Sequence, residues 1–339
     1  MSQPKPHHVV TTEPAPPRPN DRRRFLVQLG LLAGAGAMAL VPRVVRAPRR
    51  RRLETARPAL GTWVRVVVNE PDEARAARAV GRAFAAIATV DAQMSIHRGD
   101  SQVARVNALA GRGDAAVDPA VLEVVDRAVD AARRTGGIYD PTILPLMRLY
   151  GFYDAKRQHY PSDRDVAAVL GVTGYGRVRL DRASGRLGLD TAGAALDLGS
   201  IGKGWALDRA VDALRAEGIE SALVDVGGNV YGLGLPGDDE AGWSVGVAHP
   251  KTGRIDRVFT LRDTAIATSG NAEQHHALDR VFVGHLFDAR RGRPADGHLS
   301  ATVLARTGVE SDLLSTVSFL MGPGRFRVVP GALDAHFIG

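Results

Sequence analysis

The chain has 339 residues, of which 45% are hydrophobic and 24% charged, with 38 glycines and no cysteine. This composition is typical of a soluble globular α/β protein, and the lack of cysteine excludes disulfides, thiolate nucleophiles and cysteine-ligated zinc. The net charge of +7 comes from the N-terminus: residues 1–52 carry 11 Lys and Arg against 2 Asp and Glu, whereas the other 287 residues carry 33 against 35. The body of the chain therefore gives no electrostatic reason to expect nucleic-acid binding.

Residues 1–52 are predicted to form a disordered N-terminus followed by an export signal. Residues 1–20 are rich in proline and polar residues, a composition typical of disorder. Arg22, Arg23 and Arg24 then precede Phe-Leu and an apolar run to Val41, which is as long as a signal-peptide core and short for a membrane span. This order resembles a twin-arginine signal and predicts a periplasmic or other extracytoplasmic location. An uncleaved N-terminal membrane anchor is the alternative, and one folded domain is expected over residues 53–339.

The first half of the body predicts one strand, three helices and a hairpin. Apolar residues recur at helical spacing after a short β-type run, and two later helices begin at recognisable caps. Asp118 precedes a proline at a helix start, and Ser162 with Asp165 resembles a capping box. The expected elements are a strand over 61–69 and helices over 71–94, 119–135 and 163–170, followed by a hairpin of strands 177–180 and 186–189.

The most specific segment is residues 196–229, LDLGSIGKGWALDRAVDALRAEGIESALVDVGGN. Asp197 ends a strand, a glycine-rich turn carries Lys203 into a helix, and the chain returns through an apolar strand over 222–226. Glycines at positions 199, 202, 204, 227 and 228 leave backbone uncovered, so a flat or phosphorylated ligand is expected to lie against N–H groups. The alternative is an ordinary strand–helix–strand unit with glycine turns.

The second half of the body predicts mostly strands, over 243–248, 257–261, 265–268, 280–287 and 300–305, with a last helix over 310–321. Helices come early in the chain and strands come late. This order favours an α+β fold, with a largely antiparallel sheet flanked by helices, rather than a doubly wound parallel fold. The G-x-G-x-x-G at 232–237 is not a dinucleotide fingerprint, because a proline and an acidic loop follow it where a helix is required.

Eight motifs in order resemble the FAD:protein FMN transferases, or ApbE-like flavin transferases, over about residues 55–325. They are ALGT (59–62), MSIH (94–97), GGIYDPTILPLMRLYGF (136–152), LDLGSIGKGWALD (196–208), VDVGGN (224–229), IATSG (266–270), HLFDARRGRP (285–294) and SDLLST (311–316). The resemblance implies a compact two-lobed architecture and transfer of FMN from FAD to a Thr or Ser of a partner flavoprotein, with release of AMP. It also implies Mg²⁺ as cofactor and, as partner, an FMN-accepting domain of an exported or membrane redox protein.

A metal site is expected at the start of the last helix. Asp312 and Thr316 are four residues apart, so their oxygens share one helix face, and Ser315 lies on the neighbouring edge. Hard cations such as Mg²⁺ take oxygen ligands, although acidic and hydroxyl residues are also ordinary in a first helical turn. The resemblance implies that Asp312, Ser315 and Thr316 bind Mg²⁺ together with an oxygen at Ser200.

A general base is expected near the end of the strand over 280–287. His285 is placed to take a proton from a hydroxyl near neutral pH, with a structural hydrogen bond as the alternative. The resemblance implies that His285 activates the acceptor threonine, with Asp288 as the next candidate. Ala289 stands where the family usually has proline.

The resemblance also implies a set of flavin contacts: Leu60, His97, Ile138, Tyr139, Asp140, Asp197, Lys203 and Phe287. The family usually has Met at position 60 and Tyr at 97, and the imidazole at 97 alters stacking or a hydrogen bond to FAD. Tyr139 and Phe287 fit equally well as core aromatics, and Asp140 as the cap of a turn. Two other functions stay open at this point: hydrolysis of FAD to FMN and AMP, and non-catalytic binding of FAD by an exported protein.

Overall fold

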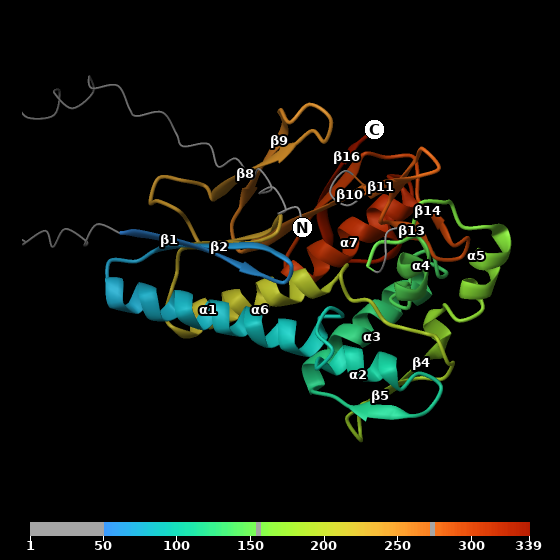
Figure 1. The fold of residues 1–339 in the computed structure, drawn as a ribbon. Helices are drawn as coiled ribbons and strands as arrows, with labels where there is room; N and C mark the ends of the chain where they lie inside the picture. The colour runs from blue at the N-terminus through green and yellow to red at the C-terminus, as the bar shows by residue number, and fades with distance from the viewer. Residues whose placement is uncertain (1–50, 154–156, 272–274) are drawn as a thin grey trace, which may run out of the picture.

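A computed structural model describes residues 51–153, 157–271 and 275–339, so the arginine pair at 22–23 and the rest of the leader lie outside the described residues (Figure 1). Its centre is a seven-stranded sheet in the order β1-β2-β6-β7-β10-β15-β16, and every neighbouring pair is antiparallel. The strands are β1 (Arg52–Ala59), β2 (Thr62–Asn69), β6 (Ala222–Val226), β7 (Asn229–Leu233), β10 (Thr264–Gly270), β15 (Ser300–Ala305) and β16 (Ala332–Ile338).

Three helices cover one face of this sheet: α1 (Glu73–Met94), α6 (Gly202–Ala216) and α7 (Gly308–Met321) (Figure 1). Alternation along β2 divides its valines between two cores. Val64, Val66 and Val68 pack with the helices, whereas Val67 packs on the opposite face, as a period of two residues requires. The opposite face is covered by a hairpin of β8 (Trp243–Ala248) and β9 (Ile255–Leu261).

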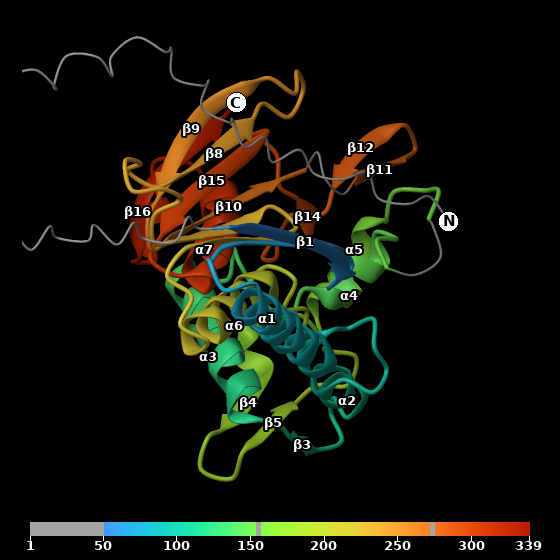
Figure 2. The same cartoon turned by 90° about the vertical axis from the view of Figure 1, so that its left-hand side faces the viewer.

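Most of the remaining elements form two further groups beside the sheet and its three helices (Figure 2). One group comprises α2 (Gln102–Ala108), α3 (Pro119–Arg134) and the small sheet of β3 (Asp114–Ala116), β4 (Val178–Asp181) and β5 (Arg186–Leu189). The other comprises α4 (Leu144–Leu149), α5 (Asp163–Leu170), the hairpin of β11 (His275–Leu278) and β12 (Val281–Gly284), and the pair β13 (Phe287–Asp288) and β14 (Arg293–Pro294). No helix in the described ranges is long and apolar enough to cross a membrane.

The α+β fold with a largely antiparallel sheet is confirmed, as are the capping box of α5 and the loop after Gly232. Four details differ from expectation. Asp197 does not end a strand, because residues 194–198 belong to no helix or strand. The chain bends at His285 and Leu286, so β12 and β13 replace one strand over 280–287. Asp118 makes no cap bond and instead accepts hydrogen bonds from two glutamine side chains. β1 begins at Arg52, inside the segment assigned to the leader.

Two tight turns lie at one end of the sheet. Gly227 and Gly228 join β6 to β7 with φ of +60° and +90°, the conformation that a two-residue hairpin turn requires. A Cβ at Gly227 would lie 2.6 Å from the Thr62 hydroxyl. Leu60 and Gly61 join β1 to β2 in the same way, with φ of +52° and +69°, which is unusual for a leucine.

Candidate functional site

A cavity of about 640 Å³ lies where the helices meet the end of the sheet. Its wall combines the β1–β2 turn, the C-terminal end of α1, the segments 139–153 and 197–203, the end of β10, the bend after β12, and α7. The sequence-predicted residues on this wall are Leu60, His97, Tyr139, Asp140, Asp197, Ser200, Lys203, His285, Phe287, Asp312 and Thr316. The fold thus brings together residues that are up to 256 positions apart, from Leu60 to Thr316.

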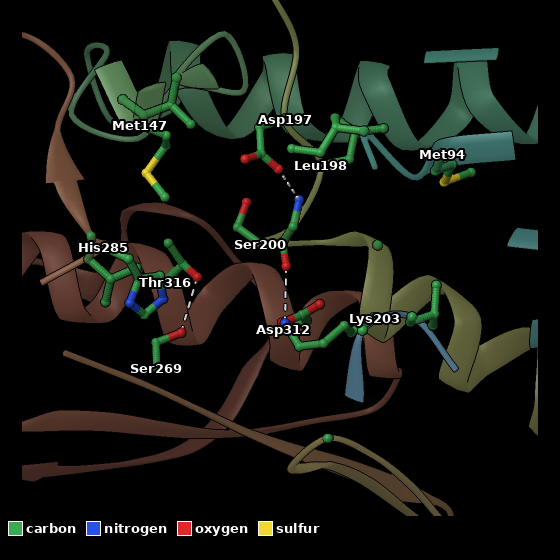
Figure 3. Close-up of a pocket in the computed structure, with 18 of the residues that line it drawn as sticks. Met94, Met147, Asp197, Leu198, Ser200, Lys203, Ser269, His285, Asp312 and Thr316 are labelled. Carbon is green, nitrogen blue, oxygen red and sulfur yellow. Dashed lines mark hydrogen bonds and ion pairs between the residues drawn. The ribbon is translucent and has the colours of Figure 1, made fainter. Parts of the chain in front are cut away.

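Asp197 is held rigidly at one side of the cavity, across from Thr316 and Asp312 (Figure 3). Its side chain accepts hydrogen bonds from the Gly199 N–H at 2.8 Å and from the Tyr153 hydroxyl at 2.8 Å. Burial and the Asp197 charge raise the pKa of Tyr153, which keeps the phenol protonated as the donor. The preceding residue is clamped as well, because the Asn107 amide bonds both the N–H and the carbonyl of Leu196.

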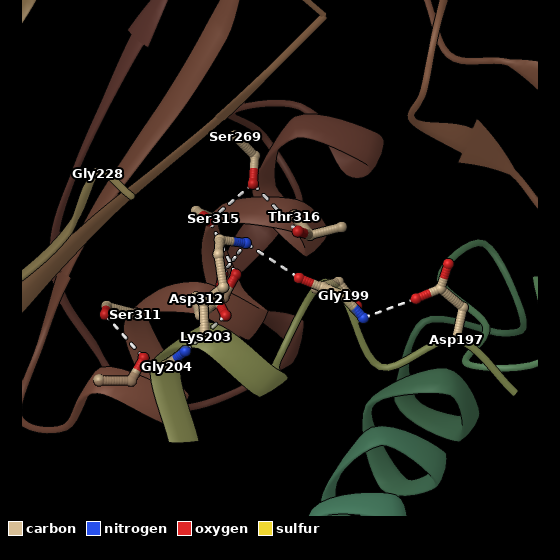
Figure 4. A network of polar contacts seen from close by, with 12 residues as sticks. Asp197, Gly199, Lys203, Gly204, Gly228, Ser269, Ser311, Asp312, Ser315 and Thr316 are labelled. Carbon is tan, nitrogen blue, oxygen red and sulfur yellow. Dashed lines mark hydrogen bonds and ion pairs between the residues drawn. The ribbon is translucent and has the colours of Figure 1, made fainter. Parts of the chain in front are cut away.

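Asp312 and Lys203 form the charged centre of the site (Figure 4). Asp312 is 3% exposed, and its Oδ2 accepts the Gly204 N–H at 2.8 Å. Lys203 Nζ donates to the Gly199 carbonyl at 3.0 Å and lies 3.6 Å from Asp312 Oδ1. One carboxylate oxygen is therefore fixed by backbone, while the other faces an ammonium group that is too distant for a strong hydrogen bond.

Three hydroxyl groups define the direction in which Thr316 presents its oxygen. Ser315 Oγ donates to the Asp312 carbonyl at 2.8 Å, and Ser269 Oγ lies 2.8 Å from Ser315 Oγ and 3.1 Å from Thr316 Oγ1. A hydroxyl has a single proton, so Ser269 donates to Ser315 and Thr316 donates to Ser269. The lone pairs of Thr316 Oγ1 are then left for a ligand in the cavity.

These donors fit a hard cation such as Mg²⁺. Asp312 Oδ1 and Thr316 Oγ1 are oxygen atoms on one helix face, the ligand type that Mg²⁺ prefers, and both residues line the cavity. Among the residues that the structure describes, no group of three or more histidine or acidic side chains is suited to a metal. A cation here would therefore take its remaining ligands from phosphate and water. Ser200 also lines the cavity, with its hydroxyl 3.0 Å from that of Tyr139.

Asp140 lies on the wall, but its carboxylate organises a turn. It accepts hydrogen bonds from the N–H and hydroxyl of Thr142 at 2.8 and 2.6 Å and from the Tyr175 N–H at 2.7 Å. Burial raises its pKa despite these donors. The turn-capping alternative considered for Asp140 therefore describes its contacts.

His285 reaches the cavity because the chain bends between β12 and β13. Phe287 reaches it too, yet it is 3% exposed and packs 4.8 Å from the Tyr150 ring, so it is also a core aromatic. Asp288 does not line the cavity. Its carboxylate accepts hydrogen bonds from the Arg290 N–H and guanidinium, which closes the turn after β13.

Two further candidates lie behind the wall. Ile138 is buried, and its carbonyl accepts the Ala289 N–H at 3.1 Å. Ser315 is fully buried between Ser269 and the Asp312 carbonyl. Neither side chain lines the cavity, so each is placed to support neighbouring wall residues.

The glycines divide in the same way. Gly199, Gly202 and Gly227 line the cavity, but their N–H groups already donate to the Asp197 carboxylate and to the Leu198 and Trp63 carbonyls, so the expectation that a ligand lies against these N–H groups is wrong. Gly204 and Gly228 do not line the cavity: Gly204 packs against α7, and Gly228 is needed for its turn.

Several wall residues were missed by the motif analysis. Trp63 stands at the rim with 48% of its surface exposed, and Tyr153 meets His97 edge-on at 5.3 Å. Ser269 belongs to the IATSG motif at 266–270, so the sequence did contain a signal for it. Tyr153 had none, because its partner Asp197 is 44 positions away.

Comparison with known proteins agrees with this architecture. Residues 60–330 match the model of the ApbE family. An FAD:protein FMN transferase from Treponema pallidum is 31% identical over 93% of this chain and 90% of its own length. A second, from Vibrio cholerae, is 32% identical over 72% of this chain and 73% of its own.

Solved structures show the same fold. The ApbE protein of Thermotoga maritima superposes with a TM-score of 0.76 at 30% identity, covering 85% of this chain and 94% of its own. The flavin transferase ApbE of Vibrio cholerae gives 0.74 at 27% identity, over 86% and 98%. Since the family match, the relatives and the folds agree over most of the chain, this protein belongs to the ApbE family.

Proposed function

We propose that this protein transfers FMN from FAD to a Thr or Ser hydroxyl of a partner protein and releases AMP. The observation that carries the proposal is a single cavity, large enough for an extended ligand, that presents Asp312, Thr316 and Lys203 beside His285. The first three suit a pyrophosphate with its counter-ion, and the fourth suits deprotonation of a hydroxyl. The curated relatives named FAD:protein FMN transferase support the same reaction.

In the proposed reaction the acceptor oxygen attacks the phosphorus of the FMN half of FAD. A new P–O bond forms, the pyrophosphate P–O bond breaks, and AMP leaves with its electron pair. His285 takes the proton from the attacking hydroxyl. The Lys203 ammonium stabilises negative charge on the phosphates.

We propose that Asp312 and Thr316, with Ser200 near them, hold Mg²⁺ in this site. When bound, the ion would neutralise charge on the pyrophosphate. The lone pairs of Thr316 that face the cavity and the nearly buried Asp312 carboxylate support this assignment. Lys203 Nζ lies 3.6 Å from Asp312 Oδ1 and so faces the same carboxylate oxygen.

Two variants separate the proposed roles. Asp312→Asn should raise the Mg²⁺ requirement and suppress both transfer and any hydrolysis of FAD, because both reactions would use the metal. His285→Asn should keep FAD and Mg²⁺ binding while slowing transfer by about 10²–10⁴-fold, as expected for a lost base. The loss should shrink at high pH, where the hydroxyl ionises more readily without help.

The assay mixes protein, FAD and Mg²⁺ with a candidate FMN-binding domain and reads flavin fluorescence on the acceptor band in a denaturing gel. AMP release without a fluorescent band would identify an FAD pyrophosphatase instead. Wild-type transfer by His285→Asn at neutral pH would mean that another group is the base.

We further propose that the protein acts outside the cytoplasm, on an FMN-accepting domain of an exported or membrane redox protein. The arginine pair at 22–23 and the short apolar run to Val41 support export by the twin-arginine route. A protein that binds a cofactor made in the cytoplasm gains from export in the folded state.

A further inference from the structure

Helices α6 and α7 cross at two glycines that touch each other. A Cβ at Gly204 would lie 2.2 Å from the Gly308 carbonyl oxygen, and a Cβ at Gly308 would lie 2.6 Å from the Gly204 carbonyl oxygen. No larger residue fits at either position without separating the helices. The N-terminal turns of both helices therefore meet backbone to backbone.

The crossing is reciprocal in its hydrogen bonds as well. On α7, Asp312 follows Gly308 by four residues, and its Oδ2 accepts the Gly204 N–H at 2.8 Å. On α6, Asp208 follows Gly204 by four residues, and its Oδ1 accepts the Gly308 N–H at 2.6 Å. Asp208 Oδ2 also accepts the Val309 N–H at 2.9 Å. Each helix thus carries a G-x-x-x-D segment whose carboxylate binds the start of the other helix.

The two carboxylates differ in what else they face. Asp312 opens onto the cavity and Lys203, whereas Asp208 lies on the far side of the crossing, in a small separate recess beside Arg209. Asp208 does not touch the cavity. Any effect that it has on a ligand there must pass through α7.

Helix α7 does not need Asp208 in order to begin. Thr307 already forms a capping box with Glu310, in which each side chain accepts the N–H of the other residue. Asp208 belongs to a different helix, and it accepts hydrogen bonds from two further N–H groups of α7, those of Gly308 and Val309. The consequence of these bonds is to fix the position of α7 against α6 rather than to start the helix.

We propose that Asp208 is a positioning residue for the phosphate–metal site: it locks α7 against α6 and thereby sets where Asp312 and Thr316 stand relative to Lys203. This inference rests on the proposed function for the identity of the ligand. The inference identifies Asp208 as a residue that lies outside the cavity and affects the site only through its hydrogen bonds to α7. Small displacements at such a site are costly because ligand groups must be held within about 0.5 Å.

The test uses full-length protein carrying Asp208→Asn. Asparagine keeps the shape and one acceptor oxygen but loses the second acceptor. The matched control is Asp212→Asn on the same helix, because the Asp212 side chain is 52% exposed and pairs with Arg209 at 2.8 Å. Mg²⁺ is titrated into FAD-loaded protein without acceptor, and the rise in unfolding temperature reports binding.

We expect Asp208→Asn to raise the half-saturating Mg²⁺ concentration about tenfold, while Asp212→Asn stays at the wild-type value. Asp208→Glu keeps the charge but moves the carboxylate by one methylene, so it should shift the Mg²⁺ requirement in the same direction. A wild-type requirement in either folded Asp208 variant would overturn the proposal.

A double-mutant cycle separates positioning from general destabilisation. In the Asp312→Asn background, Asp208→Asn should cause a much smaller further loss of Mg²⁺ binding than in the wild type, because only the positioning of Thr316 remains to be lost, although its cost in unfolding temperature persists. Equal losses in both backgrounds would show that Asp208 does not act through Asp312, and would also overturn the proposal. Because these readouts need no acceptor, they remain decisive even if the wild-type protein fails to transfer FMN.

Discussion

Leu60 combines an unfavourable backbone with a place on the cavity wall. A non-glycine residue in the left-handed region costs about 1–2 kcal/mol, and such strain persists where a site requires it. Leu60→Gly relieves this strain, but it adds the entropy cost of glycine and removes the packing of Leu60 against the main core, so the free energy of unfolding should change by less than about 1 kcal/mol in either direction. The same variant should weaken FAD binding, since it removes an apolar side chain from the wall.

Urea unfolding and calorimetry with FAD measure the two effects. Arg280→Gly is the control, because Arg280 has φ of +65° in the exposed β11–β12 turn and does not line the cavity. It should relieve strain without changing FAD affinity. Equal FAD affinity in Leu60→Gly and wild type would show that Leu60 does not contact the ligand.

The candidate site was predictable from sequence where its residues sit in dense local motifs. Asp197 and Lys203 share one glycine-rich segment, and Asp312 and Thr316 share one helix face, so local spacing was enough to choose them. Asp208 lies in a quoted motif too, but its role depends on α7, which is 100 residues away in the sequence. Tertiary pairing of this kind leaves no periodic signal in a single chain.

At the scale of elements, the α6–α7 crossing predicts that glycine-to-alanine substitutions in two helices have opposite effects on the stability of the protein. Gly204→Ala should destabilise the protein by about 1–3 kcal/mol, the usual cost of overpacking, because its Cβ would meet the Gly308 backbone. Gly81→Ala in α1 should stabilise it by about 0.5–1 kcal/mol, since Gly81 is exposed, no atom lies within 4 Å of the added Cβ, and alanine favours helix.

Denaturant midpoints of the two variants check this prediction. Gly204→Ala should also raise the half-saturating Mg²⁺ concentration, which Gly81→Ala should leave unchanged. Equal stability of the two variants would show that α6 and α7 separate easily, contrary to the close packing of their backbones.

Some helices and strands could be predicted from local sequence patterns, and others could not. A short β-type run predicted β2, and cap residues predicted α5, because both depend on neighbours along the chain. The edge strands β1 and β16 were not predicted, since their side chains are mostly exposed or half-buried and lack a clear apolar period. The break of the strand over 280–287 at His285 was missed because it serves the cavity rather than local propensity.

At the scale of the whole molecule, stability should depend on pH through Asp208. Burial raises its pKa to about 6, although the N–H groups of Gly308 and Val309 and the charge of Arg209 oppose the shift. A carboxyl with a raised folded-state pKa stabilises the fold when protonated, so this contribution is complete below about pH 4 and is lost as pH rises through about 6.

Urea unfolding between pH 4.5 and 7.5 measures this effect. The free energy of unfolding of Asp208→Asn should vary less with pH over that range than that of the wild type. A wild-type slope in the variant would assign the pH dependence to other groups.

Export belongs to the same scale. Replacing both Arg22 and Arg23 with Lys should reduce the periplasmic fraction strongly, because twin-arginine recognition depends on the pair. Cell fractionation measures the distribution. The matched control replaces Arg49 and Arg50 with Lys, which likewise leaves the charge of the leader unchanged. Undiminished periplasmic protein in the Arg22–Arg23 variant would contradict this route.

The order of the sheet has a consequence for how the chain folds. β2 pairs with β6 across more than 150 residues, and β10 pairs with β15 across about 30. Such long-range pairings slow folding. Because α7 completes the cavity, the ligand pocket does not exist until the chain has been made and folded through residue 321. A ligand of this cavity can therefore stabilise the protein only after α7 has folded, and a chain that stops before α7 gains no stability from that ligand.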